Sequence, residues 1–74
     1  MTAWTDADLG RAFREATLVV RERHAIGPVI FRSTDGWEVL GSVLVGEYRR
    51  EVRVVRPNPE HALVAFAEAL EGMG

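Results

Sequence analysis

Two alternating, β-branched runs separated by only two residues constrain this chain more than any other feature. The runs cover residues 37–45 and 48–56, and Gly46-Glu47 stands between them. A two-residue loop with glycine first is typical of a type II′ turn, whose twist matches that of antiparallel strands. The loop therefore predicts a β-hairpin with a defined register. The expected pairs are Val45 with Tyr48, Val43 with Arg50, Gly41 with Val52, and Val39 with Val54.

A further short strand, residues 29–32, is joined to this hairpin by the turn signal Thr34-Asp35-Gly36. Taken as a three-residue loop, the turn predicts these pairs: Ser33 with Trp37, Arg32 with Glu38, and Phe31 with Val39. A two-residue turn would instead point Arg32 toward the face that carries Val39. Because a one-residue shift exchanges the two faces of a strand, the hydrophobic pattern favours the three-residue loop.

A helix is predicted ahead of the strands. Its apolar residues recur at three- and four-residue spacing: Leu9, Ala12, Phe13, Ala16, Val19 and Val20. Thr5 suits the N-cap, and Trp4 and Leu9 have the spacing of a hydrophobic staple. Gly27-Pro28 is expected to stop the helix. The β-branched run Thr17-Leu18-Val19-Val20 leaves a strand as the alternative, although the run does not alternate.

A second helix is predicted after the strands. Asn58 is a suitable N-cap, Pro59 fits the first helical position, and Gly72 is expected to end the helix. Its apolar stripe comprises Leu63, Phe66, Ala67 and Leu70. The sequence therefore predicts one α+β domain over residues 1–74, in the order α-β-β-β-α. Two helices should pack on one face of a three-stranded antiparallel meander.

The two faces of the predicted sheet differ in composition. The expected core face comprises Val29, Phe31, Trp37, Val39, Val43, Val45, Val52 and Val54, with Tyr48 as a further candidate. Gly41 lies in the middle of that face and is expected to admit Phe13 or Phe66. The second face has no helix left to cover it and is the candidate interface. Its predicted members are Ile30, Arg32, Glu38, Leu40, Leu44, Arg49, Glu51, Arg53 and Val55.

The second sheet face has two interpretations. Arginine stems can shield a few leucines on a solvated sheet. Alternatively, apolar area rimmed by charge marks an interaction surface, and short domains often gain stability by oligomerising. We expect a non-catalytic self-association or protein-interaction module, which forms a homodimer through this face or binds an unknown protein partner.

Side chains suited to catalysis or metal binding are few and scattered. The chain has no cysteine, and neither His24 nor His61 has a neighbour at metal-ligand spacing. Ser33 and Ser42 lie in no nucleophile motif. We therefore expect no catalytic residue, no metal and no cofactor, and we do not expect an enzyme. An enzyme whose site forms only between chains is the remaining alternative.

Composition, charge and hydropathy bear on the source and the cellular location of the protein. All nine basic residues are arginine and the net charge is −2. Arginine without lysine is typical of a GC-rich genome, and we expect a bacterial source. Glutamine is absent and Asn58 is the only asparagine; because thermolabile amides are depleted in thermophiles, a thermophilic origin is also compatible. No apolar run approaches the roughly 20 residues that cross a bilayer. Residues 1–6 are acidic and do not resemble a signal peptide, so we expect a cytoplasmic protein without membrane contact.

The α-β-β-β-α order is similar to that of double-stranded-RNA-binding domains. Those domains bring a basic cluster at the start of the last helix to the phosphates, whereas here that stretch is Pro57-Asn58-Pro59-Glu60-His61. The resemblance implies a weak nucleic-acid-binding module as the alternative function. Its phosphate contacts would come from the arginine-rich third strand, residues 48–56, in which Glu51 is interleaved. We therefore do not expect nucleic acid as a partner.

Overall fold

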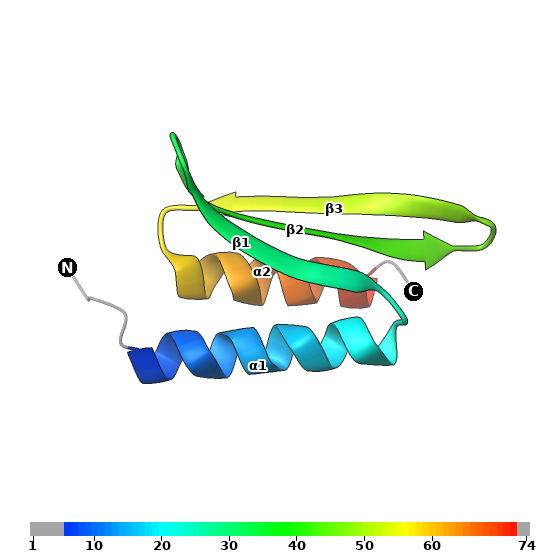
Figure 1. Ribbon diagram of the computed structural model, residues 1–74, viewed down its shortest axis with the longest axis horizontal. Helices are drawn as coiled ribbons and strands as arrows, with labels where there is room; N and C mark the ends of the chain where they lie inside the picture. Colours follow the sequence, from blue (N-terminus) through cyan, green and yellow to red (C-terminus); the bar gives the residue numbers. More distant parts are fainter. Residues whose placement is uncertain (1–5, 73–74) are drawn as a thin grey trace.

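The computed structural model describes residues 6–72 and contains five elements in the predicted order (Figure 1). They are α1 (Asp6–Glu22), β1 (Ile26–Ser33), β2 (Gly36–Val45), β3 (Tyr48–Arg56) and α2 (Pro59–Gly72). The strands form one antiparallel sheet in the order β1-β2-β3. The predicted α+β meander is thus confirmed. Figure 1 shows α1 and α2 beneath the sheet, running in the same direction.

Helix α1 continues without a break through Thr17-Leu18-Val19-Val20, so the helix prediction is confirmed and the strand alternative is wrong. The Thr17 hydroxyl donates to the Phe13 carbonyl oxygen at 2.8 Å, which satisfies it within the helix. The expected position of Phe13 in the core is wrong, because its side chain is 41% exposed. The buried stripe follows Ala12, Ala16 and Val20 instead. The predicted cap at Thr5 and staple at Trp4 lie outside the described residues.

The end of α1 differs from the prediction. The helix stops at Glu22, and Gly27-Pro28 lies inside β1. His24 takes a left-handed conformation with φ 54°. The amide of His24 donates to the Arg21 carbonyl at 3.3 Å, and that of Ala25 donates to Val20 at 2.8 Å. These two bonds form a Schellman cap, which satisfies carbonyls that the helix end would otherwise leave unpaired.

The second hairpin has the predicted register. The observed pairs include Val45 with Tyr48, Val43 with Arg50, Gly41 with Val52, and Val39 with Val54. Gly46 has φ 64°, as the first position of the two-residue loop requires. The register prediction for this hairpin is therefore confirmed.

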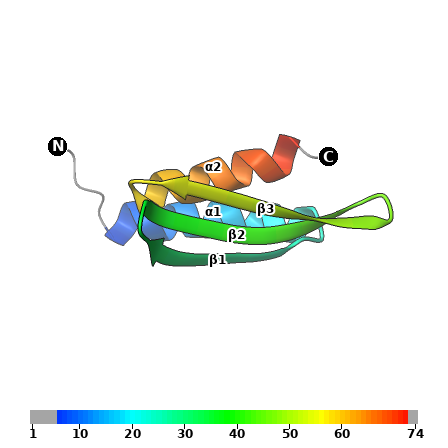
Figure 2. The same cartoon turned by 90° about the horizontal axis from the view of Figure 1, so that it is seen from above.

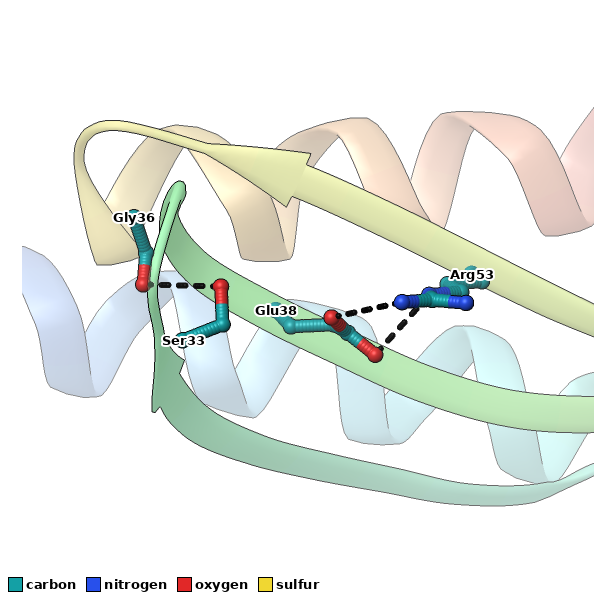
Figure 3. Close-up of polar contacts among 4 residues, drawn as sticks. All are labelled: Ser33, Gly36, Glu38 and Arg53. Atoms are coloured by element: carbon teal, nitrogen blue, oxygen red, sulfur yellow. Dashed lines mark hydrogen bonds and ion pairs between the residues drawn. The ribbon is translucent and has the colours of Figure 1, made fainter.

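The first hairpin has a different register from the predicted one. Its turn is Thr34-Asp35, and the observed pairs are Ser33 with Gly36, Arg32 with Trp37, Phe31 with Glu38, and Ile30 with Val39. Gly36 has φ 137°, and a Cβ there would lie 2.5 Å from the Arg56 carbonyl oxygen. Glycine is thus needed where β2 begins beside β3. The Ser33 hydroxyl donates to the Gly36 carbonyl at 3.3 Å (Figure 3).

The register change exchanges the faces of β1. Ile30 packs against the core cluster, whereas Val29 and Phe31 are exposed on the face away from the helices. Arg32 lies on the helix side of the sheet, and its side chain still reaches solvent because the residue is at the end of the strand. Its guanidinium carbon is 5.5 Å from the centroid of the Trp37 ring, within cation–π range. The predicted faces of Val29, Ile30, Phe31 and Arg32 are therefore wrong.

The core lies between the sheet and the two helices. Its buried apolar residues are Ala12, Ala16, Val20, Val39, Val43, Val52, Val54, Ala62, Leu63, Phe66, Ala67 and Leu70. The Phe66 ring fills the space that Gly41 leaves open, since a Cβ on Gly41 would lie 2.5 Å from Phe66 Cζ. Of the two aromatic side chains expected over Gly41, Phe66 is confirmed.

The β2–β3 hairpin extends past the ends of the helices, as Figure 2 shows. The placement of Val45 and Tyr48 in the core is wrong, because Val45 is 37% exposed and Tyr48 is 77% exposed. Both belong to this projecting arm, where no helix lies beneath the sheet. The molecule is accordingly elongated, with extents of 43 × 24 × 17 Å.

Candidate interaction face

The side chains of each strand alternate between the helix side and the opposite side of the sheet. We call the opposite side the helix-free face. From the observed register, it comprises Ile26, Val29, Phe31, Glu38, Leu40, Ser42, Leu44, Arg49, Glu51, Arg53 and Val55. Figure 1 shows no described element above this side of the sheet.

Apolar side chains dominate the β1 side and the middle of the helix-free face. Ile26 and Val29 are each 57% exposed, Leu44 is 53% exposed and Phe31 is 40% exposed. Leu40 and Val55 are half-buried. Val29 is paired directly with Leu40, so these side chains adjoin across two strands. Isolated exposed apolar residues need no explanation, but a contiguous set across three strands does.

One ion pair lies within this apolar surface. Arg53 Nε is 2.9 Å from Glu38 Oε2, and Arg53 Nη2 donates to Glu38 Oε1 at 3.2 Å (Figure 3). The Glu38 side chain is 8% exposed and that of Arg53 is 62% exposed. Glu38 is flanked on the neighbouring strands by Phe31 and Val55. The two-point contact pairs a nearly buried carboxylate with a guanidinium between two apolar neighbours.

The charges toward the projecting arm are more exposed. Arg49 Nη1 donates to Ser42 Oγ at 3.1 Å, and Ser42 is paired across the strands with Glu51. Both Arg49 and Glu51 are exposed. The helix-free face thus carries arginines and glutamates in equal number, two of each.

The structure brings together most of the side chains predicted for the candidate interface. Glu38, Leu40, Leu44, Arg49, Glu51, Arg53 and Val55 share the helix-free face. Ile30 and Arg32 do not, and Ile26, Val29 and Phe31 take the β1 positions instead. A two-residue reading of the Thr34-Asp35 turn would have found Val29 and Phe31. The face is consequently more apolar than the sequence predicts.

Within residues 6–72 no group of three or more His, Asp or Glu side chains is arranged to hold a metal ion. His24 lies just after α1 and His61 in the first turn of α2, and both are exposed. Neither helix in that range is long and apolar enough to cross a bilayer.

No protein-family model, curated protein or solved structure matches the chain. Function therefore has to be inferred from the exposed surfaces of the molecule.

Proposed function

We propose that this chain is a non-catalytic self-association module that forms a two-fold homodimer through the helix-free face. The observation that supports this most strongly is the exposure of Ile26, Val29, Phe31 and Leu44 on the same face of the sheet. Both helices lie on the other side of the sheet, so no described element remains to cover it. Packing two such sheets would give four layers, with helices on both outsides.

The charges on the helix-free face favour a second copy as the partner. Arg49 and Arg53 are balanced by Glu38 and Glu51, so the surface carries no net charge. A two-fold axis presents the same patch to itself. Such an axis lets an arginine of one chain meet a glutamate of the other. A partner of one charge sign would gain less from this mixed surface.

The face is small for an interface. Its three strands have eight to ten residues each, and at about 4.8 Å between strands and about 3.3 Å per residue their footprint is roughly 400 Å² per chain. Standard interfaces bury about 800 Å² per partner, and small ones form weak or transient complexes. We therefore expect a weak dimer, with a monomer–dimer equilibrium that depends on concentration.

The substitution Leu40→Glu tests this interface. Leu40 lies in the central strand, where an unpaired charge would be costly to bury between two sheets. The matched control is Leu18→Glu, because Leu18 is 47% exposed on α1, on the other side of the molecule. Sedimentation equilibrium should show a dimer for the parent and for Leu18→Glu, and a folded monomer for Leu40→Glu. A parent that stays monomeric at high concentration, or a dimeric Leu40→Glu, contradicts the proposal.

The alternative, weak nucleic-acid binding through β3, remains a prediction. Arg53 is paired with Glu38, and Arg49 donates to Ser42. Both arginines would have to exchange these partners for phosphates. Sub-micromolar binding to duplex RNA at physiological salt would favour this alternative, because nonspecific binders are typically weaker than about 1 μM there. We also propose a cytoplasmic location, since a chain without cysteine suits a reducing compartment.

A further inference from the structure

A second apolar feature lies on the helix side of the molecule, near the starts of α1 and α2. It is a groove of about 380 Å³ between the sheet and the helices. Its lining includes Leu9, Gly10 and Phe13 from α1, Ile30 and Trp37 from the sheet, and Leu63 from α2. The helix-free face is on the opposite side of the sheet, so the groove is independent of the proposed dimer.

Gly10 is one of the residues that line this groove. A helix is less stable with glycine in its interior than with alanine, so Gly10 in the second turn of α1 destabilises the helix. A Cβ built on Gly10 would meet nothing within 4 Å, which shows that no close packing demands glycine there. Gly10 is exposed at the edge of the groove, and a larger side chain there would meet no packed neighbour. Position 10 is therefore a site where a substitution can narrow the groove without disturbing the core.

Two arginines lie beside the aromatic wall of the groove. Trp37 is paired with Arg32 on one side and with Arg56 on the other, so the three form a row across the sheet on the helix side. The Arg32 guanidinium lies 5.5 Å from the centroid of the Trp37 ring. Arg56 Nη1 donates to the Val55 carbonyl at 2.8 Å. Both arginines are exposed and have donors free to meet an anion.

We infer that this groove binds a small aromatic carboxylate, with its rings against Phe13 and Trp37 and its carboxylate toward Arg32 and Arg56. The charge follows from the two arginines, since a guanidinium is the best side-chain partner for a carboxylate. The size follows from the volume, because a cavity of about 150 Å³ accommodates one benzene ring. The groove has room for a body of two fused rings.

Titration of the ¹⁵N-labelled full chain with 2-naphthoate tests the inference, with 2-naphthamide as the uncharged probe of the same shape. We expect saturable shifts at the Gly10 amide and the Trp37 indole, with a dissociation constant of about a millimolar. The amide should bind about five-fold more weakly, because it forms no charge-assisted bond with an arginine. Amides of the helix-free face, such as that of Leu40, should not move.

Three variants complete the test. Gly10→Leu fills the groove at a position with open space and should weaken 2-naphthoate binding about ten-fold or more while the chain stays folded. Arg32→Gln should weaken 2-naphthoate binding about five-fold and leave 2-naphthamide binding unchanged. Leu40→Glu, which alters only the proposed dimer face, should bind like the parent. The inference is overturned if 2-naphthoate shifts neither reporter, if Gly10→Leu binds it equally well, or if Arg32→Gln weakens both probes alike.

Discussion

Gly41→Ala places one added methyl group where the Phe66 ring packs on the sheet. The new Cβ would lie 2.5 Å from Phe66 Cζ, 2.8 Å from Cε1 and 2.7 Å from the Ile26 carbonyl oxygen. Real Cβ contacts are essentially never closer than 3.0 Å. Phe66 is fully buried, as are its core neighbours Leu63 and Leu70, so the ring cannot swing into solvent.

The cost can be estimated from these contacts. Overpacking a well-packed core typically costs about 1–3 kcal/mol, and the contact with a backbone oxygen puts this site near the upper end. Replacing glycine lowers the entropy of the unfolded chain, which returns about 0.5–1 kcal/mol. We expect Gly41→Ala to lower the free energy of unfolding by about 2 kcal/mol. The midpoint of thermal unfolding of a domain this size should fall by about 10 °C.

Urea unfolding followed by far-UV circular dichroism, at one fixed chain concentration, measures this change. The control is Gly10→Ala, the same substitution at a helical glycine with open space, which should stabilise the chain by up to about 1 kcal/mol. Adding Phe66→Leu replaces the ring that the new methyl meets with a shorter side chain. The double variant should therefore lose about 1 kcal/mol less than the sum of the single variants. Equal stability of Gly41→Ala and the parent, or strict additivity, would refute the interlocking of Gly41 with Phe66.

Two further predictions concern polar contacts. In urea unfolding, Arg53→Met should destabilise the chain more than Glu38→Met, by about 1 kcal/mol or more. Arg53→Met leaves a nearly buried carboxylate unpaired, whereas Glu38→Met leaves an arginine that is already in water. The reverse order would show that Glu38 is solvated. Asn58→Ala should cost about 1 kcal/mol, since Asn58 Oδ1 accepts the amides of Glu60 at 2.8 Å and His61 at 3.3 Å; an unchanged urea midpoint would show that this cap contributes nothing.

The accuracy of the sequence predictions followed the strength of the local signals. The two-residue loop at Gly46-Glu47 admits one register, and the second hairpin was correct. Asn58-Pro59 marks the start of α2 without ambiguity, and the cap is observed. The apolar stripe predicted on α1 is too wide, because it includes Phe13, whose side chain is exposed. Phe66 is one of the two aromatic side chains that the sequence predicts over Gly41.

The register of the first hairpin could not be predicted from the local sequence. Val29-Ile30-Phe31 is a continuous apolar run, so its pattern does not say which side faces the core. The charge of Arg32 decided the prediction, and that criterion failed because Arg32 lies at the strand end, over the Trp37 ring, where solvent reaches it. The clash that explains glycine at position 36 involves the Arg56 carbonyl, a contact 20 residues away in the sequence. The left-handed cap at His24 could not be predicted either, because glycine or asparagine is the usual residue at such a position.

Isotope-filtered NOE spectroscopy on a concentrated mixture of ¹³C-labelled and unlabelled chains tests the proposed dimer most directly. The proposal predicts intermolecular NOEs among the side chains of Phe31, Leu40 and Leu44, and their loss in Leu40→Glu. It predicts none between the exposed side chains of α1 and those of α2, such as Leu18 and Val64. The absence of intermolecular NOEs at millimolar concentration, or NOEs confined to the helices, would contradict self-association through the helix-free face.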